Sequence, residues 1–277
     1  MRINEITQKV FEPVEIAKGV FIAGNHIKDD RNAFHKKFDK DGKLVYKHTM
    51  QPSYNSISEF EYDEKNNLIT ETVYSEEQYE FYRSEHFTYN ESGLLVSKKS
   101  VMAEKYGGKP SYTNYFYDSK GRQIKVNHYT SGEFLYSELI TYDDSGFYKT
   151  VNLLNRVQKL TKVSEFLMNE IGQTLEIRQK DGLNPSGVLF KYYYDDFQRL
   201  KELVLTKGAA LEHREVYEYD LNGNLISTKR FKEHPEKLVH FEQNIFEYDD
   251  NQEWNSMKSY INNKIKIIIE REVKYFT

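Results

Sequence analysis

The sequence predicts an all-β fold: a long antiparallel up-and-down meander of β-hairpin repeats that forms a curled, mostly single-layer sheet. The first observation is a motif that returns nine times, with an aromatic residue, Asp or Asn, two free positions, a Gly-like residue and usually Leu two places later. The second is an alternation of apolar and polar residues before each motif, which is typical of strands. The third is the content of 23 Tyr and 17 Phe, residues that favour half-buried pleated surfaces.

The motif recurs about every 26 residues, a period that indicates a repeat protein of about nine units. Its copies begin at Phe38, Tyr62, Tyr89, Tyr117, Tyr142, Met168, Tyr194, Tyr219 and Tyr248. The position after the aromatic residue is always Asp or Asn: Asp39, Asp63, Asn90, Asp118, Asp143, Asn169, Asp195, Asp220 and Asp249. Each unit has room for two strands, and an open sheet of that many strands must curl.

Each motif has the pattern of a type I turn closed by a residue in the left-handed conformation. Glycine fills this closing position six times, as Gly42, Gly93, Gly121, Gly146, Gly172 and Gly223. Asn66 fills it once, and the other two copies have Gln198 and Gln252. Because the left-handed conformation is more costly for glutamine, these last two hairpins should be the loosest.

This turn places the aromatic residue opposite the residue two positions after the closing one. The expected pairs are Phe38/Leu44, Tyr62/Leu68, Tyr89/Leu95, Tyr117/Gln123, Tyr142/Tyr148, Met168/Thr174, Tyr194/Leu200, Tyr219/Leu225 and Tyr248/Trp254. Two residues upstream lies a second, mostly aromatic column: Lys36, Phe60, Phe87, Tyr115, Ile140, Phe166, Tyr192, Tyr217 and Phe246. The partners expected opposite it are mostly polar: Tyr46, Thr70, Ser97, Lys125, Thr150, Glu176, Glu202, Ser227 and Ser256. We therefore expect a thin apolar face.

The chain is expected to form one continuous unit with three parts. Residues 34–260 contain the repeats, residues 1–33 are an N-terminal cap segment, and residues 261–277 are a C-terminal capping strand, because the ends of a repeat array need protection. The second turn of each unit varies in sequence, as in 106–110, 182–187 and 232–236. Variable turns on one edge are expected to carry recognition.

Candidate chemistry is sparse. The chain has no cysteine, and its eight histidines show no metal-ligand spacing, so we expect no cofactor, no metal and no enzymatic activity. The net charge of −4 and the interspersed charges argue against nucleic acid as a partner. The sequence lacks an apolar run long enough for a membrane helix and an evident signal peptide, so we expect no membrane insertion. The protein is expected to be cytoplasmic if Met1 is the natural start, and otherwise secreted or on the cell surface.

The motif Tyr-Asp-x-x-Gly-x-Leu resembles the YD repeats of the RHS family, with the most similar copies at Phe38, Tyr117, Tyr142 and Tyr219. The resemblance covers about residues 34–260 and implies β-hairpins strung into a spiralling sheet, which in large toxins of that family forms a hollow shell around a toxic domain. This chain is far shorter and has no comparable proteolytic segment or toxin domain. A weaker resemblance is to the MORN-variant repeats of bacterial antitoxin-like proteins, which share Tyr-x-x-x-Gly-x-Leu.

Two functions are compatible with these features. The first is a non-catalytic protein-interaction scaffold, an immunity or accessory partner of an RHS-type toxin. The alternative is a carbohydrate or cell-surface binding module that uses exposed aromatic residues to stack on sugar rings. The candidates for such binding are the tyrosines outside the two aromatic columns: Tyr79, Tyr82, Tyr106, Tyr112 and Tyr136.

Overall fold

The computed structural model describes residues 2–27, 30–50, 55–77, 79–183, 185–232 and 237–276. These residues form 21 β-strands and one short 3₁₀ helix, η1 (Glu104–Tyr106). The strands are β1 (Ile3–Ala17), β2 (Val20–Ile27), β3 (Phe34–Phe38), β4 (Leu44–Thr49), β5 (Ser56–Tyr62), β6 (Leu68–Ser75), β7 (Phe81–Tyr89), β8 (Leu95–Met102), β9 (Ser111–Tyr117), β10 (Gln123–Thr130), β11 (Glu133–Tyr142), β12 (Tyr148–Leu154), β13 (Leu160–Met168), β14 (Thr174–Asp181), β15 (Val188–Tyr194), β16 (Leu200–Lys207), β17 (Ala210–Tyr219), β18 (Leu225–Lys232), β19 (Lys237–Tyr248), β20 (Trp254–Ile261) and β21 (Lys264–Tyr275).

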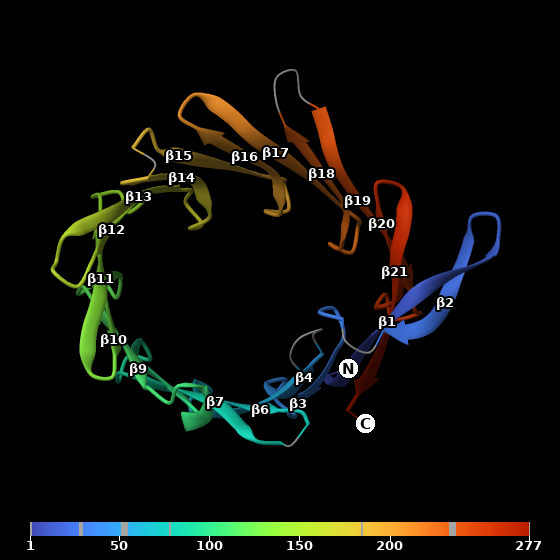
Figure 1. The fold of residues 1–277 in the computed structure, drawn as a ribbon, viewed down its shortest axis with the longest axis horizontal. Coiled ribbons are helices and arrows are strands. Elements are labelled where there is room, and N and C mark those ends of the chain that lie inside the picture. The colour runs from blue at the N-terminus through green and yellow to red at the C-terminus, as the bar shows by residue number, and fades with distance from the viewer. Residues whose placement is uncertain are drawn as a thin grey trace. The chain divides into compact units, whose positions relative to one another are not determined.

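The chain divides into two compact units. Unit 1 contains Met1–Thr88, Ser100–Lys109 and Glu242–Thr277, and unit 2 contains Tyr89–Lys99 and Pro110–Phe241. In unit 2, strands β9 to β18 pair in sequence order as an antiparallel meander. In unit 1, β1 pairs with β3 on one side and with β21 on the other (Figure 1).

The pairing of β1 with β21 overturns the expected open, single-layer meander. All strands belong to one antiparallel sheet, and the first and last strands of the chain are hydrogen-bonded from Ile3↔Tyr275 to Phe11↔Ile268. The sheet is therefore closed at this seam, which is the connectivity of an up-and-down β-barrel. The segment Ile265–Arg271 of β21 is rich in β-branched residues and would otherwise present an exposed sheet edge. Pairing with β1 removes that edge.

The seam also contains much of the buried apolar surface among the described residues. Val10 of β1 and Ala33 have no exposed surface, and Ile268 and Ile269 of β21 are almost fully buried. Val10, Ala33 and Ile269 form one cluster, against which Trp254 and other partly buried apolar residues pack. Burial of such side chains contributes about 1.5–3 kcal/mol each, which explains why the chain ends join.

The nine predicted turns are all present. In each one the closing residue donates its backbone N–H to the carbonyl of the Asp or Asn, as in Gly42 N to Asp39 O at 3.0 Å and Gln252 N to Asp249 O at 3.1 Å. All nine closing residues have positive φ, including Asn66 at 69° and Gln198 at 64°. The two free positions between the Asp or Asn and the closing residue therefore determine little of this geometry.

The predicted register is correct for most of the pairs that adjoin the turns, and it is wrong farther from them. Tyr219 pairs with Leu225 as expected, but Tyr217 pairs with Thr228 in place of Ser227. A bulge after the first pair shifts the register by one residue in most of these hairpins, and a shift of one exchanges the two faces of a strand. The observed pairs of the upstream column are Lys36/Lys47, Phe60/Glu71, Tyr115/Val126, Ile140/Val151, Phe166/Ile177, Tyr192/Leu203, Tyr217/Thr228 and Phe246/Met257. The face is thus more apolar than the sequence suggested.

One predicted pair next to a turn is also wrong. Tyr142 pairs with Lys149, not with Tyr148. The reason is a longer loop, because Asp143 donates its N–H to the carbonyl of Tyr148 at 3.0 Å, whereas the equivalent bond in the other turns ends one residue earlier. Tyr148 is consequently left half exposed.

Candidate functional site

The motif tyrosines connect each repeat to the one before it. Their hydroxyl groups donate to the backbone carbonyl of the residue two positions after the preceding closing residue. The bonds given by the structure are Tyr62 to Leu44 (2.9 Å), Tyr117 to Leu95 (2.7 Å), Tyr142 to Gln123 (3.0 Å), Tyr194 to Thr174 (2.8 Å) and Tyr219 to Leu200 (2.9 Å). The sequence analysis missed this role, although the preference for Tyr over Phe at seven of nine copies signals a need for the hydroxyl. These residues are structural supports.

The Asp side chains of the motif accept hydrogen bonds from backbone N–H groups within the turns. Asp118 Oδ1 accepts hydrogen bonds from the backbone N–H groups of Lys120 and Arg122, both at 2.9 Å. The bond from Arg122 is the main reason that the pKa of Asp118 lies below its usual value. The hydroxyl of Ser145 lowers the pKa of Asp143 in the same way. A carboxylate held ionised by such donors is poorly suited to proton transfer.

The buried carboxylate of Glu215 in β17 is likewise held ionised by hydrogen-bond donors. Glu215 is 8% exposed and accepts hydrogen bonds from the hydroxyl of Tyr217 and from the Arg230 guanidinium at 2.6 Å. Burial by itself opposes ionisation, but these donors hold the pKa of Glu215 below its usual value. Glu215 is therefore a paired structural charge.

The five candidate binding tyrosines are divided between the two units, with Tyr79, Tyr82 and Tyr106 in unit 1 and Tyr112 and Tyr136 in unit 2. Tyr79 stacks on Tyr74 with ring centroids 4.5 Å apart, and Tyr82 meets Tyr106 edge to face at 4.9 Å. In unit 2, Lys99 Nζ lies 5.8 Å from the ring centre of Tyr112, and His128 stacks on Tyr136 at 4.1 Å. Each of these rings already has a side chain against it.

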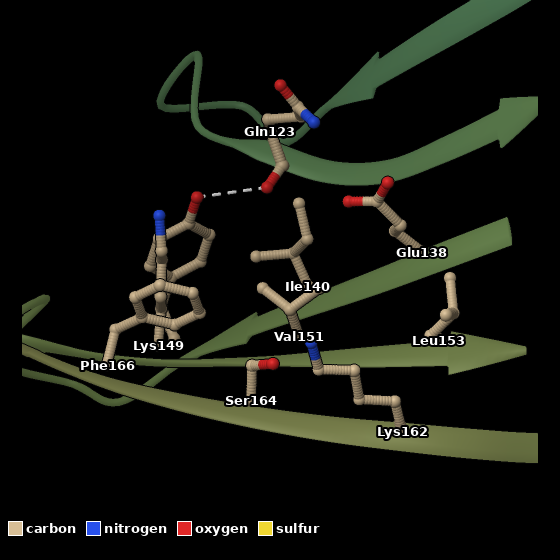
Figure 2. A pocket seen from close by; sticks show the side chains of 10 residues that line it. Gln123, Glu138, Ile140, Lys149, Val151, Leu153, Lys162, Ser164 and Phe166 are labelled. Atoms are coloured by element: carbon tan, nitrogen blue, oxygen red, sulfur yellow. Dashed lines mark hydrogen bonds between the residues drawn. The ribbon is translucent and has the colours of Figure 1, made fainter. Parts of the chain in front are cut away.

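A shallow depression of about 420 Å³ lies on the motif-tyrosine face of β11, β12 and β13. Figure 2 shows Ile140 and Val151 at its centre, with Glu138 above them and Lys162 below them in this view. Phe166 at its rim is covered by the Lys149 ammonium, 4.7 Å from the ring centre. Sugar binding usually requires an open aromatic face, and one face of this ring is occupied.

A second surface of unit 2 stands out by its exposed apolar side chains. Phe147, Ile171, Phe197 and Leu221 lie on four successive motif turns and are 39%, 58%, 78% and 105% exposed. We call these four residues the apolar turn row. They occupy free turn positions, or in the case of Phe147 the position after Gly146, so turn geometry does not explain their apolar character.

Hydrogen bonds join neighbouring turns along this row. The Phe147 carbonyl accepts from Met168 N at 2.8 Å, Gln173 Nε2 donates to the Gln198 carbonyl at 2.9 Å, and Arg199 donates to the Asp220 carbonyl at 3.1 Å. Phe147 and Ile171 also line one depression of about 480 Å³. The row is therefore a connected surface.

Acidic residues accompany the row. Asp144, Glu170 and Asp196 occupy the first free position of three of these turns, and all three are exposed. Arg199 is engaged with Asp195 through an ion pair of 2.7 Å, and its guanidinium lies 4.9 Å from the Phe197 ring centre. The row thus presents apolar groups beside exposed acidic side chains.

The variable turns of unit 2 also carry exposed apolar side chains. Val157 and Leu183 are 78% and 91% exposed and lie on successive turns of the opposite edge. Residues 233–236 and Asn184, which belong to two of the predicted variable turns, lie outside the described residues. A further turn of motif type, closed by Gln158 at φ 59°, was missed because it has neither the aromatic residue nor the glycine.

Within the described ranges, no group of three or more His, Cys, Asp or Glu side chains is arranged to hold a metal ion. The same ranges contain no helix that is long and apolar enough to cross a membrane.

No family model matches the chain, and no curated protein sequence is similar to it. Among solved structures, the crystal structure of TcdB2-TccC3 aligns with 88% of this chain at 12% identity and a TM-score of 0.34, and the alignment spans 16% of that much longer chain. A porin-like protein from Bacteroides uniformis aligns over 98% of both chains at 10% identity and a TM-score of 0.38. One from Bacteroides vulgatus aligns over 100% of this chain and 99% of its own at 10% identity and 0.29. At these scores the similarities show no shared function.

Proposed function

We propose that the chain is a non-catalytic protein-interaction scaffold and that the apolar turn row is its binding surface. The observation that carries this proposal is the exposure of Phe147, Ile171, Phe197 and Leu221 on four successive turns. Single exposed apolar residues are ordinary, but a contiguous group of them on a polar protein indicates an interaction site.

The backbone beneath the row supports the same proposal. The Asx bonds within each turn and the bonds between turns hold the apolar side chains on an ordered frame, as with Asp195 Oδ1 and Phe197 N at 2.9 Å. Binding to such a frame loses less conformational entropy than binding to a flexible loop.

The charges indicate the kind of partner. Asp144, Glu170 and Asp196 lie beside the apolar groups, so a partner with an apolar patch fringed by Lys or Arg is complementary. The YD-like motif favours a partner from an RHS-type toxin system. Carbohydrate binding is less well supported, because each of the five candidate tyrosines has a ring or a cation against it.

A direct test titrates an RHS-type toxin polypeptide into the full chain, with binding measured by calorimetry. We expect Ile171→Ser/Phe197→Ser to weaken binding by about tenfold or more, because burial of one large apolar side chain contributes about 1.5–3 kcal/mol. The matched control is Val157→Ser/Leu183→Ser, which removes two apolar side chains that are at least as exposed from the opposite edge of the same unit.

Equal binding by both double variants would show that the row is not the binding surface. A chain that binds a glycan array and ignores the toxin polypeptide would support the carbohydrate alternative and overturn the proposed scaffold.

A further inference from the structure

The β1–β2 ribbon of unit 1 is a surface that the proposed function does not use. β1 pairs with β21 only as far as Phe11, and residues 12–17 continue as a two-stranded ribbon with β2. Figure 1 shows this ribbon extending away from β21 and β3. Across the described residues, β2 has a hydrogen-bonded partner strand on one side only.

The two edges of the ribbon are protected differently. The β1 edge carries Glu12, Pro13 and Glu15, and proline and charge are the usual means of preventing a sheet edge from pairing. The β2 edge, Val20–Ile27, contains no proline and no Asp, Glu, Lys or Arg. One edge is thus blocked, and the other is open to a further strand.

One face of the ribbon is apolar and exposed. Val14, Ile16, Val20 and Ile22 are between 43% and 59% exposed, and Val14 lies directly opposite Ile22. Gly24 keeps this face compact, because a Cβ at that position would come within 2.3 Å of Val14 Cγ2. Two-stranded ribbons are marginally stable in water, so an added strand stabilises this one.

We propose that β2 pairs with β2 of a second copy of the chain, antiparallel and about a twofold axis near Phe21. In this register Val20 of one copy lies opposite Ile22 of the other on the same face. The absence of charge in β2 makes it self-complementary, since no like charges meet in an antiparallel pair. The four β-branched residues of each copy then form one continuous apolar face across four strands.

The interface is one strand edge, so the dimer is weak and depends on concentration. Interfaces below about 1,200 Å² are typical of transient complexes. Sedimentation equilibrium of the full chain should therefore show a mass that rises from 33.0 kDa toward twice this value between low and high micromolar concentration.

Charge exchange tests the interface independently of folding. Val20→Lys/Ile22→Lys and Val20→Glu/Ile22→Glu should each remain monomeric, because like charges meet across the twofold axis, and mixing the two variants should restore a dimer. Val157→Lys/Leu183→Lys adds the same two charges at exposed apolar positions of unit 2 and should leave the dimer intact.

A wild-type chain that stays monomeric at high micromolar concentration overturns the proposal. So does a dimer that persists in both β2 charge variants, or a mixture of the two variants that fails to associate.

Discussion

Two turns of the molecule have the same backbone hydrogen bonds but expose side chains of different polarity. In the turn at Asp63, Oδ1 accepts from Lys65 N at 2.9 Å and Asn67 N at 2.8 Å, and in the turn at Asp195 it accepts from Phe197 N and Arg199 N, both at 2.9 Å. The free positions hold Glu64 and Lys65 in the first turn and Asp196 and Phe197 in the second.

The comparison shows which positions of the repeat are structural. The first and fourth turn positions and the tyrosine determine the geometry, so the two positions between them can change without loss of the hairpin. Unit 1 has polar residues there, whereas successive turns of unit 2 have Ile171, Phe197 and Leu221. This freedom is why we assign the difference to binding.

The largest loss of stability is expected from removal of the motif tyrosine, which both turns have in common. Tyr62→Ala and Tyr219→Ala should each lower the free energy of unfolding by about 2–4 kcal/mol, because a partly buried ring and its hydrogen bond are lost together. Denaturant unfolding measures both. Glu218→Ala is the control for the opposite face, where a half-exposed ion pair with Lys229 should contribute about 0.5 kcal/mol or less. A large cost at Glu218 and a small one at Tyr219 would reverse our assignment of the faces.

A smaller loss of stability is expected when only the hydroxyl group of the tyrosine is removed. Tyr62→Phe and Tyr219→Phe should each cost about 0.5–1.5 kcal/mol, since the bonds to Leu44 O and Leu200 O are lost and the rings remain. Tyr148→Phe should be nearly neutral, because this ring is half exposed and none of the described residues bonds its hydroxyl. If all three variants behave alike, the hydroxyl bonds do not connect the repeats.

The smallest effect distinguishes the closing residues of the two turns. Asn66 and Gln198 both have positive φ, at 69° and 64°, but asparagine tolerates this conformation better than glutamine. Gln198→Gly should therefore stabilise the chain by up to about 1 kcal/mol, and Asn66→Gly should change it little. Thermal unfolding of the two variants provides the measurement, and an equal gain at both positions would mean that strain at Gln198 is negligible.

The sequence by itself determined the strands of the repeats, the nine turns and the pairs next to most of them. These features depend on neighbouring residues, because an Asp side chain can reach the N–H groups two and four positions later without help from the rest of the chain. The register beyond the turn was not accessible, since a bulge of one residue leaves no signature in the alternation and yet replaced Glu202 by Leu203 opposite Tyr192.

Closure and the candidate site were decided only by tertiary structure. The apolar pattern of β1 suits an edge cap as well as a strand between two neighbours, and the pairing with β21 joins residues from opposite ends of the chain. The sequence shows Ile171, Phe197 and Leu221 as isolated residues about 25 positions apart. They became one surface because antiparallel hairpins place alternate turns on one edge, where hydrogen bonds between turns hold them together.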